Sequence, residues 1–153
     1  MLAEEELCFS QSVDPPDTVR FMLPSDAISI REGLVGLFAL DLMEPLTAES
    51  LSAAQIVLAE ALNNVVEHAY AQYPGRIEIW VTRRESYLFI RIMDDGLAMP
   101  GGDLPGGKPG WPEDLPEGGF GWSLIRNLSH DLTYARDGKR NLLSLCISVG
   151  YQG

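Results

Sequence analysis

The sequence predicts a two-layer α/β (α+β) sandwich, in which a mixed, mostly antiparallel sheet is covered on one face by about three helices. The expected elements run in the order strand, helix, helix, two strands, long loop, helix, two strands. Strands adjacent in the sequence can pair antiparallel, and the helices can then cover one face. With 153 residues, 46% of them hydrophobic, the chain is long enough for one domain with a core and short for two. We expect a lead-in over residues 1–17 and one domain over residues 18–153.

Five segments have the alternation and residue types of strands. They are residues 18–23, 76–82, 87–93, 132–136 and 141–149. The last two read as a hairpin that closes around Asp137-Gly138. Residues 94–119, between the third and fourth of these strands, are rich in proline and glycine, which excludes a regular element. A loop this long inside a compact domain is typically a lid or a binding loop.

Three segments have the periodicity of helices. Residues 27–42 carry apolar residues at helical spacing, namely Ile28, Val35, Phe38 and Leu42. A second helix should run from Thr47 to about Tyr70, because its apolar residues fall within a narrow arc of the helical wheel: Leu51, Leu58, Leu62, Val65 and Ala69. Residues 121–129 predict a third, short helix.

The bulk composition excludes some classes of function. The net charge of −11 argues against direct binding of nucleic acid, which needs a basic surface, and suits contact with basic protein surfaces. No apolar stretch is long enough to cross a membrane, and the acidic start lacks the basic region of a signal peptide. We therefore expect a cytoplasmic protein. Cys8 and Cys146 form no metal-binding pattern.

The long second helix has a polar side opposite its apolar arc. Glu60, Asn64 and His68 lie one turn apart in a row, and Glu67 lies on the same side. A carboxylate there can deprotonate a hydroxyl or a water, and an amide oxygen one turn later can help to hold Mg²⁺, which prefers hard oxygen ligands. The alternative is an ordinary solvated face, the commoner meaning of such spacing.

Asp94-Asp95-Gly96 stands at the end of an expected strand. An acid at that place can accept a hydrogen bond from an exocyclic amine such as that of adenine, and Gly96 lets the backbone come close to a flat ligand. Taken alone, the motif is more often a plain Asp-Gly turn.

A glycine-rich stretch opens the third expected helix. It comprises Gly118, Gly119, Phe120, Gly121 and Trp122. Free N–H groups and the helix dipole at such a start suit a phosphate. The stretch is neither a Walker A loop nor a Rossmann turn, and a flexible linker before the helix is an equally good interpretation.

In this order the motifs resemble the N, G1 and G2 boxes of the GHKL (Bergerat-fold) ATPase superfamily, and most closely those of the anti-sigma-factor serine kinases, which are histidine-kinase-like ATPases. The resemblance covers about residues 18–149, with residues 60–68 as the N box, 94–96 as G1 and 119–124 as G2. The phrase EALNNVVEHAY is its most specific part.

The resemblance assigns roles to single residues. It implies that Glu60 is the general base, that Asn64 coordinates Mg²⁺, and that Asp94 binds the adenine amine of ATP or ADP with Gly96 giving clearance. The phosphates would lie on Gly119 and Gly121, with residues 97–117 as the ATP lid. The remaining contacts to the nucleotide would come from Glu67, His68, Gly118, Phe120 and Trp122. The chain departs from the usual pattern at Ala98, Trp122 and Ser123.

The resemblance also implies an activity and partners. The family moves the γ-phosphate of ATP to a serine of an anti-anti-sigma (STAS-domain) protein and sequesters a sigma factor, and its members are often homodimers. Arg31 matches a position where relatives meet protein partners, although an ordinary surface arginine is the simpler interpretation. Two other functions stay open: a regulatory module that holds nucleotide without transferring phosphate, and a detached histidine-kinase domain. The absence of histidine from the N-terminal segment counts against the second.

Overall fold

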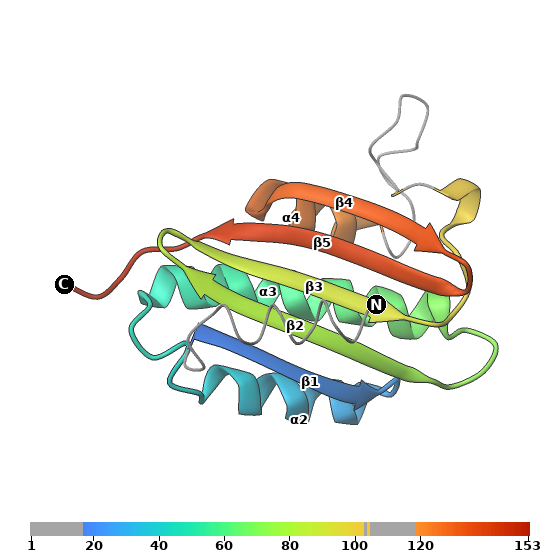
Figure 1. The fold of residues 1–153 in the computed structure, drawn as a ribbon, viewed down its shortest axis with the longest axis horizontal. Coiled ribbons are helices and arrows are strands. Elements are labelled where there is room, and N and C mark those ends of the chain that lie inside the picture. The colour runs from blue at the N-terminus through green and yellow to red at the C-terminus, as the bar shows by residue number, and fades with distance from the viewer. Residues whose placement is uncertain (1–16, 103, 105–118) are drawn as a thin grey trace.

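The computed structural model describes residues 17–102, 104 and 119–153. They form a five-stranded sheet with its helices packed on one face (Figure 1). The two-layer α/β sandwich predicted from the sequence is therefore confirmed. Residues 1–16 of the expected lead-in, Gly118 and most of the expected lid lie outside the described residues.

The sheet has the strand order β1-β2-β3-β5-β4. Its strands are β1 (Thr18–Pro24), β2 (Arg76–Arg84), β3 (Tyr87–Asp94), β4 (His130–Asp137) and β5 (Arg140–Ser148). All four pairings between these strands are antiparallel, where a mixed, mostly antiparallel sheet was expected. The ends of β3 and β5 face each other in register, so that Asp94 lies opposite Asn141.

The helices are α2 (Ala27–Phe38), α3 (Ala48–Asn64) and α4 (Gly119–Leu128), with a π-helical turn η2 (Val65–Ala69) and a short 3₁₀ turn η3 (Pro100–Gly102). Asp26 and Thr47 begin α2 and α3 by accepting hydrogen bonds from the backbone N–H groups of Ser29 and Ser50, each one turn later. None of the described helices is long and apolar enough to span a membrane.

The predicted first helix is present, but two of the apolar residues that indicated it do not face the core. Ile28 and Val35 are 67% and 68% exposed, whereas Ile30 and Leu37 are buried. The helix also ends at Phe38 instead of continuing to residue 42. Helical spacing alone could not show which apolar residues are buried, because Ile28 and Val35 have the same spacing as Ile30 and Leu37. Only contact with the sheet distinguishes the two pairs.

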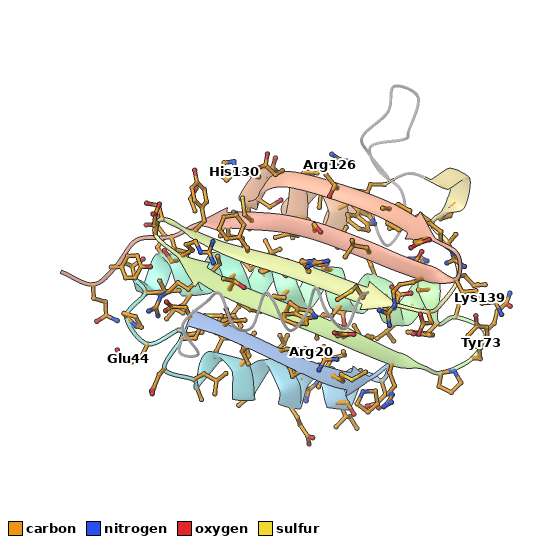
Figure 2. All side chains as sticks on the ribbon, viewed as in Figure 1. Arg20, Glu44, Tyr73, Arg126, His130 and Lys139 are labelled. Atoms are coloured by element: carbon orange, nitrogen blue, oxygen red, sulfur yellow. The ribbon has the colours of Figure 1, made fainter. Side chains whose placement is uncertain are left out.

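The core lies between the helices and the facing side of the sheet. The central helix contributes Leu58 and Leu62, both fully buried, and β2 contributes alternate residues such as Ile77 and Ile79. Because side chains alternate across a strand, Asp94 and Asn141 belong to this helix-facing side: Asp94 pairs with Ile77, and Asn141 pairs with Asp94. Asp94 and Asn141 therefore place a buried polar pair on the helix-facing side at one end of the sheet, where β3 ends and β5 begins. Lys139 and Tyr73 lie at that end of the molecule (Figure 2).

Candidate nucleotide site

The central helix changes its geometry next to the candidate site. It is α-helical to Asn64 and then makes one π-helical turn, in which the N–H of Tyr70 donates to the carbonyl of Val65 at 3.0 Å. The predicted extent of the helix, to about Tyr70, is confirmed, because η2 continues α3 to Ala69, but the π-helical turn was not predicted. Glu60 and Asn64 keep the expected one-turn spacing, but His68 lies within the wider turn. Single π turns inside α-helices are frequent at functional sites.

Glu60 and Asn64 lie directly against the start of α4. A Cβ atom added to Gly121 would lie 2.6 Å from Oε1 of Glu60 and 3.6 Å from Nδ2 of Asn64. Only a glycine therefore lets the two helices come this close while Glu60 keeps its position. The structure therefore brings the acid, the amide and this glycine together at one place.

The amide of Asn64 is buried, with 7% of the residue exposed, so the polar face of α3 is not simply a solvated one. Its Nδ2 donates to the carbonyl of Glu60 at 2.9 Å. No described residue donates to the other end of the amide, Oδ1. That end is a hard oxygen of the kind Mg²⁺ binds, and Mg²⁺ in nucleotide sites commonly takes only one or two protein ligands beside the phosphates. The donor set thus fits a magnesium ion.

Asp94 is the buried acid of the site, with 4% of the residue exposed. Its Oδ1 accepts hydrogen bonds from Nδ2 of Asn141 at 2.7 Å and from the N–H of Gly96 at 2.8 Å. Burial raises the pKa of this carboxyl above its ordinary value, against the lowering effect of these two donors. A buried carboxylate of this kind gains from any further donor that enters the cavity.

Gly96 has a different role from the expected one. A Cβ atom there would lie 2.3 Å from the carbonyl oxygen of Ala69, and the next N–H, of Leu97, donates to that same oxygen at 2.7 Å. The glycine therefore lets the chain after β3 pack against the end of η2, and it is not among the described residues that line the cavity. Tyr70 strengthens this junction, because its hydroxyl accepts from the N–H of Asp95 at 2.8 Å.

A cavity of about 430 Å³, including the space at its mouth, lies between α3, the ends of β3 and β5, and the start of α4. Asn64, His68, Asp94 and Trp122 of the predicted site line it. The rest of its lining includes apolar groups on both sides: Ala61, Val65, Met99 and Leu143. An apolar slot with one carboxylate, Asp94, and two amides, Asn64 and Asn141, has the composition of a site for a flat, partly polar ligand.

Three further polar residues of the site were not predicted. Oδ1 of Asn141 accepts from the hydroxyl of Tyr134 and, at 3.0 Å, from Nη1 of Arg136. The Tyr134 hydroxyl in turn accepts from the N–H of Met99 at 3.0 Å. Each of these residues lies in a strand where nothing in the local sequence pattern distinguishes it. Only the pairing of β3, β4 and β5 brings the three residues close to Asp94. The one usable signal was the prediction that a strand begins at residue 141.

The remaining predicted residues fall in three groups. His68 and Glu67 are exposed, and of the two only His68 lines the cavity. Gly119 and Phe120 lie in the first turn of α4, and their side-chain environment is outside the described part of the structure, as is all of Gly118. Arg31 is exposed on α2, away from the cavity lining.

The sequence matches the family described as "Histidine kinase-like ATPase domain" over residues 24–147. The chain belongs to this family. The predicted resemblance to the GHKL superfamily is thereby confirmed, and the cavity lies where its three boxes meet.

Serine-protein kinases named RsbW are among the relatives. Those of Bacillus cereus (strain AH820) and Bacillus thuringiensis (strain Al Hakam) are each 31% identical over 96 residues, which is 58% of this chain and 59% of the relative. The match thus spans less than two thirds of these relatives. Among solved structures, the Acinetobacter baumannii histidine kinase AdeS has a TM-score of 0.44 and 16% identity, over 97% of this chain and 75% of that one.

Proposed function

We propose that this protein binds ATP with Mg²⁺ and transfers the γ-phosphoryl group to a serine of an anti-anti-sigma (STAS-domain) protein, and that it holds a sigma factor when that partner is phosphorylated. The observation that carries the proposal is that Glu60 and Asn64 lie against Gly121, beside a cavity that Asn64 and Asp94 both line. The family membership and the similarity to RsbW serine-protein kinases support it.

In this proposal the adenine enters the apolar slot and its exocyclic amine donates to Asp94. The phosphates extend toward the start of α4, where helix N–H groups favour negative charge. Asn64 contributes Oδ1 to the magnesium ion, which when bound neutralises charge on the phosphates. His68 and Trp122, which line the cavity, contact the nucleotide from either side.

Glu60 supplies the base. Its carboxylate accepts the proton of the partner's serine hydroxyl while that oxygen forms a bond to the γ-phosphorus. The bond from the γ-phosphorus to the bridging oxygen breaks, and ADP leaves with that electron pair. Since such transfers depend on positioning and charge neutralisation, the contact between Glu60 and Gly121 matters because it fixes the base next to the phosphate end of the site.

Partner binding is proposed at the exposed face of α2, which contains Arg31. This face also holds Ile28 and Val35, which are both exposed apolar residues. An acidic chain with net charge −11 suits basic protein surfaces. A homodimer and a cytoplasmic location belong to the same proposal.

The test is to mix the protein with Mg-ATP and a STAS-domain partner and to detect phosphoserine by mass spectrometry. We expect transfer by the wild type and a rate reduced about 100-fold or more in Glu60→Gln, because general-base catalysis contributes that much. Glu49→Gln, in the first turn of the same helix and exposed, is the matched control and should transfer normally. Nucleotide binding without transfer to any partner would instead favour the regulatory module that only holds nucleotide.

A further inference from the structure

The hydrogen bonds around Asn141 fix which end of its amide faces the acid of the site. We propose that Asn141 is the positioning residue of Asp94: oriented by Tyr134 and Arg136, it holds Asp94 as a hydrogen-bond acceptor and thereby sets a preference for adenine over guanine. This inference rests on the proposed function, since it assigns the base specificity of the same nucleotide site.

The orientation of the Asn141 amide follows from its partners. Arg136 can only donate, and its Nη1 donates to Oδ1 of Asn141 at 3.0 Å, beside the Tyr134 hydroxyl, which donates to the same atom. The opposite end, Nδ2, donates to Oδ1 of Asp94 at 2.7 Å and to the carbonyl of Leu97 at 2.9 Å. A flipped amide would set its N–H groups against Arg136 and its oxygen against two acceptors.

This orientation gives Asp94 a defined state. Its Oδ1 is occupied by two donors, Asn141 Nδ2 and Gly96 N–H, and no described residue donates to Oδ2. An ionised carboxylate can only accept. Adenine offers an amino group at position 6, whereas guanine carries a carbonyl oxygen there. Asp94 held as an acceptor therefore favours adenine and repels guanine, while a protonated Asp94 could donate to guanine.

Burial, two hydrogen bonds and two charged groups act on the Asp94 carboxyl. Burial raises the pKa of Asp94, the hydrogen bonds from Asn141 and Gly96 lower it, nearby Asp95 raises it and Arg136 lowers it. The other titratable groups at this corner, among the described residues, are Tyr70 and His68 from η2 and its end, Tyr134 from β4, and Arg140, which pairs with Asp95 at 3.4 Å. Loss of the Asn141 donor would remove one of the few contacts that oppose burial.

The test is calorimetric titration of the protein with Mg-ATP and Mg-GTP at several pH values. For Asn141→Leu, of similar size but without a donor, we expect the ratio of ATP to GTP affinity to fall about tenfold or more. As the pH falls, we also expect the variant to lose ATP affinity at a higher pH than the wild type does, because without the Asn141 donor Asp94 is protonated at a higher pH. For Tyr134→Phe the ratio should fall about threefold to tenfold, since one hydrogen bond is removed. ATP titrates identically in every sample, so a shifted pH midpoint comes from the protein.

Tyr151→Phe is the matched control. It removes a hydroxyl that donates to the carbonyl of Glu85 at 2.8 Å, away from the cavity lining, and should leave the ratio unchanged. If Asn141→Leu does not fold by circular dichroism, Tyr134→Phe decides. Equal weakening of ATP and GTP, with the pH midpoint unmoved, would overturn the inference, because that is the pattern of a purely structural role. A wild type that binds neither nucleotide overturns the proposed function as well, whereas a wild type that prefers ATP beside unaffected variants overturns only the inference.

Discussion

The burial of the Asp94 carboxyl is not explained by a gain in the stability of the fold. Its pKa is raised by burial, so the folded protein binds a proton there more readily than the unfolded chain does. Stability is therefore lost as the pH rises from the ordinary value of 3.8 through the raised value. A residue kept at this cost is a candidate for function.

The first prediction concerns Asp94→Asn. The new amide keeps Oδ1 for Asn141 and Gly96, so the fold should persist, and its stability relative to the wild type should increase as the pH rises, because no buried carboxylate forms. Its second end would present N–H groups to the adenine amine, so ATP binding should weaken about tenfold or more. Thermal melts at acid and neutral pH and calorimetric titration with Mg-ATP check both parts. Lower stability at neutral pH, or unchanged binding of ATP, would contradict this account.

Glu60, Asn64, Asp94 and Gly121 could be selected from the sequence, because a helical period and two glycine motifs are local patterns and together they resemble a known family. It did not identify Asn141, Tyr134 or Arg136, since their roles come from contacts with residues about 40 positions away. The role of Gly96 was misjudged for a similar reason. Its neighbour, Ala69, belongs to another element, and a close approach between distant segments leaves no local signal.

At the scale of elements, Gly96 and Gly121 both lie at close contacts, but what they contact differs. The backbone of Ala69 blocks a side chain at Gly96, whereas only the flexible end of Glu60 blocks one at Gly121. The second obstacle can move aside by rotation of a side chain, but the first requires η2 to shift away from β3.

We therefore predict opposite outcomes for two alanine substitutions. Gly96→Ala should lower the free energy of unfolding by about 1–3 kcal/mol through overpacking. Gly121→Ala should fold normally, because alanine also favours a helix, but should displace the Glu60 carboxylate and slow phosphoryl transfer more than it weakens ATP binding. Urea unfolding and the phosphoserine assay measure the two effects.

Gly36→Ala is the control for helix propensity. Nothing lies within 4 Å of an added Cβ there, so this change should stabilise α2 by about 1 kcal/mol. Strong destabilisation of Gly121→Ala with unchanged stability of Gly96→Ala would show that the contacts of the two glycines have been interpreted the wrong way round.

The element boundaries were mostly predictable, because alternation of residue types indicates strands and capping residues such as Asp26 and Thr47 indicate the starts of helices. The π turn was not predictable. It ends where the carbonyl of Ala69 meets Gly96 and accepts from the N–H of Leu97, a contact between distant segments that has no local pattern in the sequence.

At the scale of the molecule, a buried acid links strands of the sheet on the face opposite the helices. Glu78 of β2 accepts from Nε of Arg20 at 2.7 Å and from Nε1 of Trp80 at 2.7 Å, with Arg140 at 4.0 Å. Arg20 lies over the sheet at β1 (Figure 2). Burial raises the pKa of Glu78, but the hydrogen bonds from Arg20 and Trp80 outweigh it, so the pKa is lowered overall. This acid links the edge strand to the centre of the sheet.

Glu78→Gln should lower the free energy of unfolding at neutral pH by about 1–3 kcal/mol, because hydrogen bonds to a charged group are lost. A lowered pKa stabilises the fold above the ordinary value of 4.5, and that contribution disappears as the pH falls through the lowered value. The difference between variant and wild type in urea unfolding should therefore shrink in acid. Glu44→Gln, at an exposed residue, is the control and should show no difference at either pH. A difference for Glu78→Gln that grows in acid would contradict the assignment.

The most direct test of the central claim is a crystal structure of the protein with Mg²⁺ and a non-hydrolysable ATP analogue. The account predicts the adenine amine on Asp94, magnesium on Oδ1 of Asn64, and the γ-phosphate between Glu60 and the start of α4. A nucleotide bound elsewhere, with the cavity between Asp94 and Asn64 empty, would contradict it.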